Sequence, residues 1–383
     1  MPQKKILIVD TDVASRNFIA RKLYDANYDV LQAGSGKEGL IGSWRDRPDL
    51  VIFDPVMADL KGEDFAAKLR NDPRTTHIPL IALSSDPSLA RAHSCLDAGF
   101  NEYITKSGQA VSMLMDMLVR LLGLTEEAMK QGGLSIIFTS AKGGTGTSSM
   151  CANIAMNIAQ NQPEARLVVL DLVLPIGSIA PIVGYDGALN IVSVADMPAD
   201  ATTPQFFHSS LPNMGIWRFN LLAGSPDPEL SNHLNVGRIW DIVTALKASH
   251  DYVLIDIGRS LSKITLPLIQ HADLAALLIS TDISTISLTK TLLDYLISKG
   301  VNPNSIFTIL NRAVGLEGLS KADAEKILGI RINAAMPYLG TNFAFANSHH
   351  QPFTLKFPND TASLIFTETA REMSAQARRL RGE

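Results

Sequence analysis

The sequence predicts an α/β protein with two doubly wound domains, each a parallel sheet covered by helices on both faces. The chain has 383 residues, more than a single hydrophobic core usually supports. Short apolar runs alternate with amphipathic segments along its length, which is typical of parallel sheets. Hydrophobic residues make up 46% of the chain and charged residues 19%, as in folded globular domains. We expect a first domain at residues 1–122, a linker at 123–133 and a second domain at 134–383.

The first domain contains five apolar runs that we expect to form a flavodoxin-like sheet. They occupy residues 5–9, 28–33, 50–54, 78–83 and 102–105. Segments with helical spacing separate them, so the strands should run parallel. Ligands of such sheets bind at the carboxyl ends of the strands, so polar residues at those ends indicate a site. These residues are Asp10, Asp54, Ser84 and Lys106.

This set resembles the response-regulator receiver domain through "ILIVDTD", "PDLVIFDPVMADLKG", "IPLIALSS" and "GFNEYITKS". The resemblance covers residues 4–122. It implies that Asp54 is the phosphoacceptor and that Asp10 is a Mg²⁺ ligand. It also implies that Ser84 is the hydroxyl switch and that Lys106 pairs with the phosphoryl group.

Three positions depart from the receiver pattern. Thr11 replaces the second of two adjacent acids, and Ala58 and Ser107 each replace a proline. Mg²⁺ prefers octahedral oxygen ligands, so the missing carboxylate should weaken metal binding; Asp12 follows, but its side chain should point elsewhere. Two interpretations remain open: Asp54 is phosphorylated, or the domain keeps the fold as a docking or dimerisation module.

A second and larger alternation of strands and helices follows the linker, which ends in Gly132-Gly133. Its strand-like runs occupy residues 134–140, 166–172, 219–224, 252–257, 274–280 and 305–311. Spacing and polarity again predict a parallel sheet with helices on both faces.

A glycine-rich turn, "SAKGGTGTSS" at residues 140–149, lies between the first of these strands and a helix with regularly spaced apolar residues. In such a unit successive backbone N–H groups can surround an anion, and the helix N-terminus adds partial positive charge. Lys142 is near enough along the chain to contact a phosphate, and the Ser148 hydroxyl stands where a P-loop presents its Mg²⁺ ligand. The turn predicts a phosphate site; a glycine-rich turn without a ligand is the alternative.

The loop resembles the deviant Walker A motif of the MinD/ParA ATPases, which are P-loop NTPases of the SIMIBI class, and the resemblance continues through most of residues 134–383. In that family the first lysine, here Lys142, reaches the nucleotide of the partner subunit in an ATP-bound dimer. Asp256 matches the carboxylate that binds Mg²⁺ through water, Ser148 matches the direct Mg²⁺ ligand, and Asp171 is the candidate catalytic carboxylate. Pro337 ends a further strand. The implied nucleotide-binding residues are Lys142, Gly143, Gly144, Thr145, Gly146, Thr147, Ser148, Asn311 and Arg312.

Two departures from this motif affect hydrolysis more than binding. Thr147 stands where a P-loop lysine stabilises charge between the β- and γ-phosphates, and a threonine supplies no charge. Val173 replaces the second acid of the family's D-x-D pair, which helps to orient the attacking water. The sequence therefore does not predict an efficient ATPase: we expect ATP to bind and to be hydrolysed weakly or not at all.

The C-terminal segment "TASLIFTETAREMSAQARRLRGE" is predicted to be a helix, and MinD proteins end in a lipid-binding helix. Its regularly spaced apolar residues are Phe366, Ala370, Met373, Ala377 and Leu380. Two of these five are alanines and the arginines gather at one end, whereas an interfacial helix needs bulky apolar anchors opposite a basic face. We expect a helix that packs in the core and no direct membrane insertion.

Charge and composition limit the classes of partner. The net charge is −4 and the pI is about 6.1, so we expect no DNA binding. Cys95 and Cys151 fall in different expected domains without metal-ligand spacing, as in a reducing compartment. The first apolar run is too short for a signal peptide. A cytoplasmic protein is expected.

The chain joins a receiver-like domain that departs from its family pattern to a MinD/ParA-like domain whose loop lacks the P-loop lysine. This combination resembles the TadZ/CpaE family, the localisation factors of the tight-adherence (Flp) pilus secretion system. The resemblance implies an ATP-binding scaffold with Mg²⁺ as second cofactor, which forms a homodimer at the cell pole. Such a protein recruits the pilus machinery, including a separate secretion ATPase, and stays peripheral to the inner membrane through its partners. Two alternatives remain: an active MinD/ParA-type ATPase that cycles on a surface, and a response regulator controlled by phosphorylation of Asp54.

Overall fold

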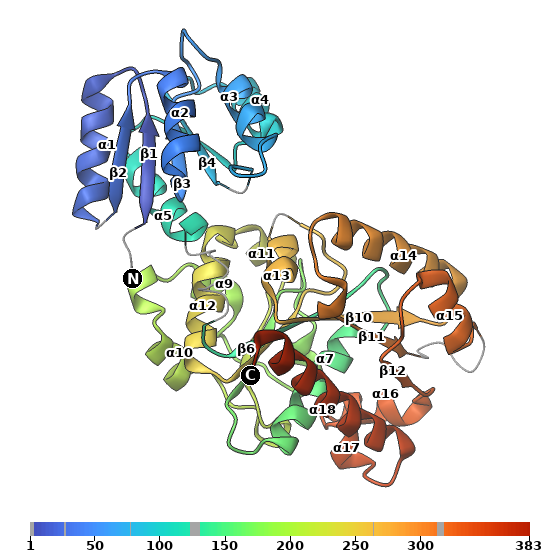
Figure 1. Cartoon of the computed structure of the whole chain (residues 1–383). Coiled ribbons are helices and arrows are strands. Elements are labelled where there is room, and N and C mark those ends of the chain that lie inside the picture. The colour runs from blue at the N-terminus through green and yellow to red at the C-terminus, as the bar shows by residue number, and fades with distance from the viewer. Residues whose placement is uncertain (1–3, 27, 77, 123–130, 263, 312–317) are drawn as a thin grey trace. The chain divides into compact units, whose positions relative to one another are not determined.

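The computed structural model describes residues 4–26, 28–76, 78–122, 131–262, 264–311 and 318–383 (Figure 1). The chain divides into two compact units, Met1–Thr125 and Glu126–Glu383. Each unit has its own parallel sheet, so each is described by itself.

The first unit has five parallel strands in the order β2-β1-β3-β4-β5. They are β1 (Lys5–Val9), β2 (Asp29–Ala33), β3 (Leu50–Phe53), β4 (Leu80–Ser84) and β5 (Glu102–Thr105). The strand order reverses at β1, between β2 and β3. In open α/β sheets ligands bind at such a reversal, beside the carboxyl ends of the strands.

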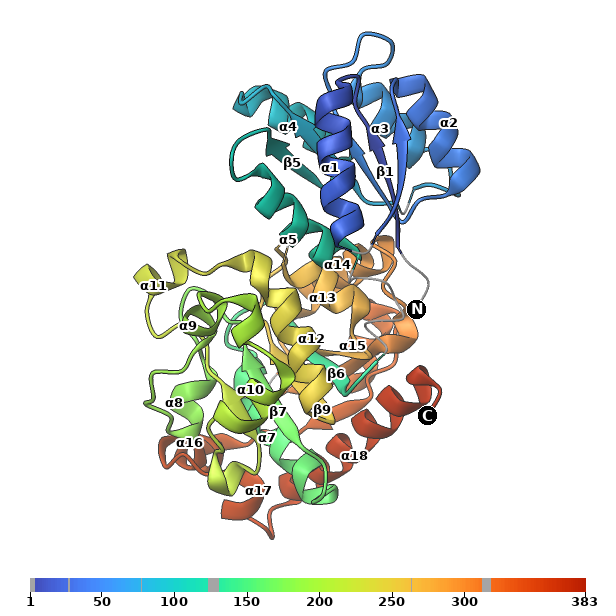
Figure 2. The ribbon, with the colours of Figure 1, turned by 90° about the vertical axis from the view of Figure 1, so that its left-hand side faces the viewer.

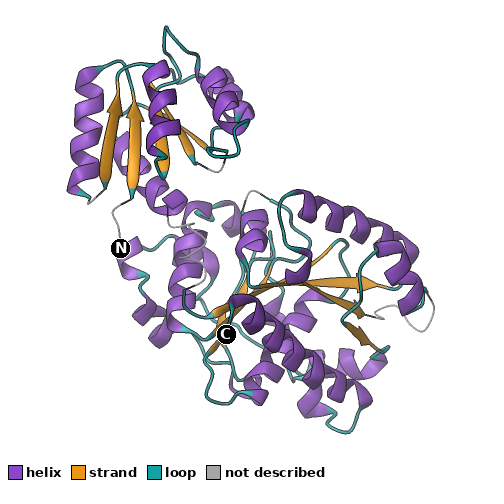
Figure 3. Cartoon of the chain, in the orientation of Figure 1, coloured by secondary structure: helices purple, strands orange, loops and turns teal. Residues whose placement is uncertain are grey.

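Helices cover both faces of this sheet (Figure 3). They are α1 (Val13–Asp25), α2 (Gly36–Asp46), α3 (Gly62–Arg70), α4 (Leu89–Ala98) and α5 (Ala110–Leu122). Alternate β1 residues point to opposite faces: Ile6 and Ile8 pack with α1 and α5, whereas Leu7 and Val9 pack with α2, α3 and α4. Two apolar layers therefore hold the sheet, as the apolar runs predict.

The second unit has seven parallel strands in the order β12-β11-β10-β6-β9-β7-β8. They are β6 (Leu134–Ser140), β7 (Leu167–Asp171), β8 (Asn220–Leu222), β9 (Tyr252–Asp256), β10 (Leu274–Ser280), β11 (Ile306–Asn311) and β12 (Ala334–Met336). The central strands β6, β9 and β10 are buried along their whole length, which explains their continuous apolar runs. The predicted fold class is confirmed for both units.

Helices of very different length surround this second sheet. They are α7 (Thr147–Asn161), α8 (Ile179–Val183), α9 (Ile191–Ala195), α10 (Pro204–Ser210), α11 (Pro228–Asn232), α12 (Ile239–Ser249), α13 (Thr265–His271), α14 (Ile283–Ser298), α15 (Lys321–Leu328), α16 (Gly340–Ser348), α17 (Phe353–Lys356) and α18 (Thr361–Arg381). Short 3₁₀ turns occupy Ala199–Ala201, Gly215–Trp217, Val236–Arg238 and Pro303–Ser305.

The C-terminal helix α18 packs against α7, the helix that follows the glycine-rich turn (Figure 2). Four of its five regularly spaced apolar residues are buried in the core, and only Leu380, at 38% exposure, departs from the prediction. The apolar face of α18 is therefore used inside the unit. Among the described residues, no helix combines the length and apolar character that crossing a bilayer requires.

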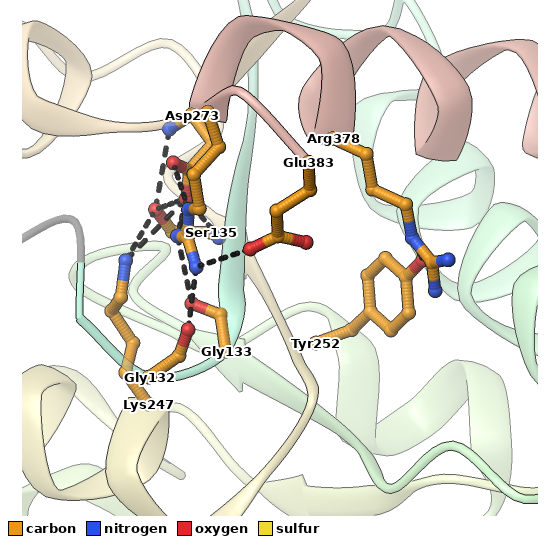
Figure 4. A network of polar contacts seen from close by, with 9 residues as sticks. Gly132, Gly133, Ser135, Lys247, Tyr252, Asp273, Arg378 and Glu383 are labelled. Carbon is orange, nitrogen blue, oxygen red and sulfur yellow. Dashed lines mark hydrogen bonds and ion pairs between the residues drawn. The ribbon is translucent and has the colours of Figure 1, made fainter.

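A buried polar network ties the end of α18 to the start of β6 (Figure 4). Arg381 donates from Nε to Asp273 Oδ1 at 2.9 Å and from its guanidinium to the carbonyl of Gly133 at 3.1 Å. Lys247 Nζ lies 3.4 Å from Asp273 Oδ2, and burial lowers the pKa of Lys247 to about 8 against the opposing charge of Asp273. A Cβ on Gly133 would lie 2.0 Å from the His250 carbonyl, so this close approach requires glycine.

Candidate functional sites

The first unit brings together three charged residues predicted from the sequence. Asp10 follows β1, Asp54 follows β3 and Lys106 follows β5. Lys106 Nζ lies 2.8 Å from Asp10 Oδ2 and 2.7 Å from Asp54 Oδ2. Burial lowers the pKa of Lys106, but hydrogen bonds to the two carboxylates outweigh it and the pKa is raised. One ammonium thus pairs with two buried carboxylates and offsets one of their two negative charges.

Backbone N–H groups bind the second oxygen of each carboxylate. Asp10 Oδ1 accepts from the Asp12 amide at 2.8 Å, and Asp54 Oδ1 accepts from the Val56 amide at 2.9 Å. The side chain of Asp12 instead caps α1, where it accepts from the amides of Ala14 and Ser15. The sequence predicts that the Asp12 side chain points away from the site, and the structure agrees: Asp12 does not replace the acid missing at Thr11.

Ser84 ends β4 and is fully buried, and its hydroxyl accepts from the Asp86 amide at 3.1 Å. Sequence reasoning missed Arg91 on α4, whose guanidinium donates to the Pro55 carbonyl at 2.6 Å and to Glu63 Oε1 at 2.7 Å. Arg91 thereby ties α3 and α4 to the turn that follows Asp54. No local pattern distinguishes such an arginine from a solvated one.

In the second unit the glycine-rich turn joins β6 to α7. Gly144 and Gly146 have φ values of +81° and +85°, a backbone conformation that residues with a side chain rarely adopt. A Cβ on Gly143 or Gly144 would meet no atom within 4 Å, so the backbone faces open space there. A Cβ on Gly146 would lie 2.8 Å from Asn311 Nδ2. The loop can therefore admit an anion close to the backbone at Gly143 and Gly144, whereas Asn311 occupies the space beside Gly146.

The side chains of Thr145 and Thr147 lie beneath this loop. Thr147 Oγ1 donates to Ser140 Oγ at 3.0 Å and lies 3.0 Å from Thr145 Oγ1. Thr145 Oγ1 in turn donates to the Lys142 carbonyl at 3.2 Å. Both residues are predicted to bind nucleotide; their hydroxyls stabilise the loop from inside, so a phosphate would meet them through their backbone amides.

Lys142 extends toward the start of α14. Its ammonium lies 3.2 Å from Asp282 Oδ1 and 3.0 Å from Ser284 Oγ, and its side chain is 43% exposed. The sequence prediction omitted Asp282 and Ser284. Because Asp282 follows β10, the rule that pointed to the other strand-end residues also applies to it.

Asp171 and Asp256 end the neighbouring strands β7 and β9, are paired in register and are buried. Asp171 Oδ2 accepts from the amides of Ser178 at 2.6 Å and Ile179 at 2.8 Å, and Oδ1 accepts from the Val173 amide at 3.0 Å. Burial raises the pKa of Asp171 to about 6, although these N–H groups lower it. Its contacts hold the loop after β7, and its role as the candidate catalytic carboxylate stays a prediction.

The two oxygens of Asp256 differ in their surroundings. Oδ1 accepts from the Gly258 amide at 2.9 Å, whereas Oδ2 is buried and has no hydrogen-bond partner within the described part of the chain. Burial and the charge of Asp171 raise the pKa of Asp256 to about 7, while the Ser148 hydroxyl lowers it. A carboxylate and a hydroxyl placed in this way can hold a hydrated Mg²⁺ ion.

Asn311, one of the implied nucleotide-binding residues, contacts the glycine-rich turn. It is buried at the end of β11, and its Nδ2 donates to the Thr145 carbonyl at 2.8 Å. It therefore braces the loop, and this interaction accounts for the glycine at Gly146. Arg312 lies outside the described residues. Pro337 directly follows β12, as expected.

Sequence reasoning also did not predict that asparagines on α7 are buried and hydrogen-bonded. Asn153 Oδ1 accepts from the Phe353 amide at 2.8 Å, and Asn157 Nδ2 donates to Thr354 Oγ1 at 2.7 Å. Asn347 Nδ2 donates to Ser149 Oγ at 3.2 Å. These bonds fix the helix that carries the loop against α16 and α17.

Comparison with known proteins identifies the first unit. Residues 6–118 match the family model of the response regulator receiver domain. The transcriptional regulator RpaA of Synechocystis sp. is 32% identical over 110 residues, which are 29% of this chain and 46% of RpaA. The response regulator PleD of Caulobacter vibrioides is 30% identical over 102 residues, which are 27% of this chain and 22% of PleD. The chain thus spans less than half the length of either relative.

Solved structures give the fold of the second unit. A ParA family ATPase from Chlorobium tepidum superposes with a TM-score of 0.57 at 20% identity, over 62% of this chain and 98% of that protein. The septum site-determining protein MinD of Pyrococcus horikoshii, solved with Mg-ADP, gives 0.56 at 19% identity, over 65% of this chain and 98% of MinD. The chain therefore joins a receiver domain to a unit with the fold of the MinD and ParA ATPases.

Proposed function

We propose that this chain is an ATP-binding localisation or scaffold protein that forms a nucleotide-promoted homodimer with weak or absent hydrolysis. The observation that carries the proposal is the loop itself. Its backbone is open at Gly143 and Gly144, with Ser148 and the unpartnered oxygen of Asp256 beside it, whereas Thr147 is turned inward. These features support binding, and the threonine at position 147 supports weak turnover.

Binding is supported by the backbone and by two side chains. The open loop at the N-terminus of α7 offers amide groups and helix-dipole charge to a phosphate. Ser148 would hold Mg²⁺ directly and Asp256 would hold it through water, and the bound ion would neutralise phosphate charge.

Weak hydrolysis is supported by three residues. Thr147 brings no charge, and its hydroxyl is engaged beneath the loop. Val173 has no acid, and the described hydrogen bonds of Asp171 all go to backbone amides. A site without charge placed for the transition state loses a large part of its rate enhancement.

A homodimer is supported by the surface around the site. Four exposed apolar residues lie in the segments that follow β7, β9 and β10, at the same edge of the sheet as the glycine-rich turn. They are Leu174, Ile176, Leu261 and Ile283. On this proposal a second copy of the chain covers these apolar side chains.

A role at the cell pole in Flp pilus assembly rests on the TadZ/CpaE resemblance, which joins the same two folds in this order. On this proposal the dimer stays in the cytoplasm, peripheral to the inner membrane, and recruits pilus proteins that include a secretion ATPase. A fluorescent fusion should gather at one pole and pili should be lost on deletion. A uniform distribution with normal pili would contradict this role.

A second function is favoured by the cluster of Asp10, Asp54 and Lys106, in which the residues for phosphoryl transfer to Asp54 lie in contact. Labelling with acetyl phosphate, with Asp54→Asn as control, tests this regulator. Stoichiometric labelling of Asp54 that alters the oligomer would support it, whereas an unlabelled chain leaves the receiver as a docking module.

The nucleotide proposal is tested by titrating the whole chain with a fluorescent ATP analogue, with and without Mg²⁺. Saturable binding supports the assignment of Asp256 if Mg²⁺ increases the affinity of the wild type and this increase is lost in Asp256→Asn. Binding that ignores Mg²⁺ and Asp256 would contradict it.

A further inference from the structure

We infer that Asp282 and Ser284 are positioning residues for Lys142: they hold its ammonium at the start of α14, and a nucleotide that recruits Lys142 must compete with them. This inference rests on the proposed function. Asp282 and Ser284 lie outside the glycine-rich turn, and their competition for Lys142 would lower the affinity of the site for nucleotide.

The contact is organised around one oxygen of Asp282. Oδ1 lies 3.2 Å from Lys142 Nζ, accepts from Ser284 Oγ at 2.7 Å and also accepts from the Thr285 amide at 2.9 Å. Ser284 Oγ lies 3.0 Å from Lys142 Nζ, so the ammonium meets two oxygens at once. Oδ2 accepts from Thr285 Oγ1 at 2.6 Å.

These bonds fix the carboxylate before Lys142 arrives. Asp282 is the N-cap of α14, so its side chain has one orientation set by the helix. Burial raises its pKa, but hydrogen bonds from Ser284, Thr285 and Lys142 outweigh it and hold the pKa well below the usual range. An ionised, oriented carboxylate is a good partner for an ammonium.

Competition matters because Lys142 is the only lysine in the sequence of the loop at residues 140–149. Thr147 stands where a P-loop has its lysine, so the loop lacks that cation. The ammonium that would meet a phosphate is therefore the one that Asp282 holds. For a half-exposed pair of this kind, release of Lys142 should change affinity by about two- to fivefold.

Asp282→Asn separates positioning from helix capping, because asparagine also caps helices well but carries no charge. We expect Asp282→Asn to bind Mg·ATP about two- to fivefold more tightly than wild type. In a Lys142→Ala background the same substitution should have no effect. A gain of equal size in both backgrounds would show general charge repulsion and would overturn the inference.

Asp294→Asn is the matched control. Asp294 lies on the same helix and pairs with Lys290 at 2.6 Å on the surface. Its removal alters net charge equally and should leave the affinity for Mg·ATP unchanged. An equal gain in this variant would also overturn the inference.

The contact itself is tested without nucleotide by the rate at which an amine-reactive reagent labels Lys142, read by peptide mass spectrometry. We expect faster labelling in Asp282→Asn and in Ser284→Ala, with Lys290 as the internal reference. Equal rates in wild type and both variants would overturn the inference. If wild type and Asp282→Asn both fail to bind Mg·ATP, the competition and the proposed function fail together; if wild type binds and Asp282→Asn binds equally, only the competition fails.

Discussion

Asp256→Asn should stabilise the fold while weakening the site, because the carboxylate is buried at a cost. The pKa of Asp256 is raised from 3.8 to about 7, and at 1.36 kcal/mol per unit the ionised form costs about 4 kcal/mol. In the variant a buried amide nitrogen replaces Oδ2, and leaving it without a hydrogen bond costs about 1–3 kcal/mol, which offsets part of this gain. We therefore expect Asp256→Asn to be about 1–3 kcal/mol more stable than wild type at pH 8.

The sign of the pH dependence follows from the raised pKa. Between pH 3.8 and about 7 the native state keeps a proton that the unfolded state has released, so native stability falls as pH rises through this window. From pH 5 to pH 8 the wild type should lose about 3 kcal/mol through Asp256. Asp256→Asn should lack this loss.

Urea denaturation of wild type and Asp256→Asn at pH 5 and pH 8 measures both quantities. Asp294→Asn is a control, because that aspartate is exposed on α14. The same preparations should show weaker Mg²⁺-dependent nucleotide binding in Asp256→Asn alone. Parallel pH profiles for wild type and Asp256→Asn would refute the reasoning that Asp256 is held at a cost beside the loop.

Three further predictions concern other residues. Asp273→Asn should lower the free energy of unfolding by about 3–5 kcal/mol in urea denaturation, because it leaves two buried cations without their carboxylate. Burial lowers the pKa of His250 from 6.5 to about 4, so the unfolded state takes up a proton at higher pH than the native state. Urea denaturation should therefore show that the free energy of unfolding falls by about 3 kcal/mol between pH 6.5 and pH 4. This loss should be absent in His250→Gln. Thr147→Val removes hydroxyl bonds beneath the loop and should weaken ATP binding about threefold to tenfold in a nucleotide titration, whereas Thr147→Ser should retain it.

The fold could be predicted because it depends on patterns that are local in the sequence. Continuous apolar runs such as residues 252–257 mark strands buried on both faces, and the alternation with helices requires parallel strands. The polar residues at strand ends then had to meet at one edge. Asp10, Asp54 and Lys106 do so.

Side-chain direction within the loop could not be predicted. Thr147 and Asn311 point to its inside because of positive φ values at Gly144 and Gly146 and the position of β11, which no local pattern encodes. The network of Asp273 and Arg381 joins residues 108 positions apart, so only the tertiary fold reveals it. Asp282 could have been found, because it follows a strand as the other site residues do.

The central claim is tested most directly by one sample followed in two ways: light-scattering mass and phosphate release after addition of Mg·ATP. The account predicts that the mass doubles at saturating Mg·ATP and that phosphate release stays near the buffer background. Lys142→Ala should abolish the mass change. Steady phosphate release at the rate of an efficient ATPase, or an unchanged mass at saturating nucleotide, would contradict the account.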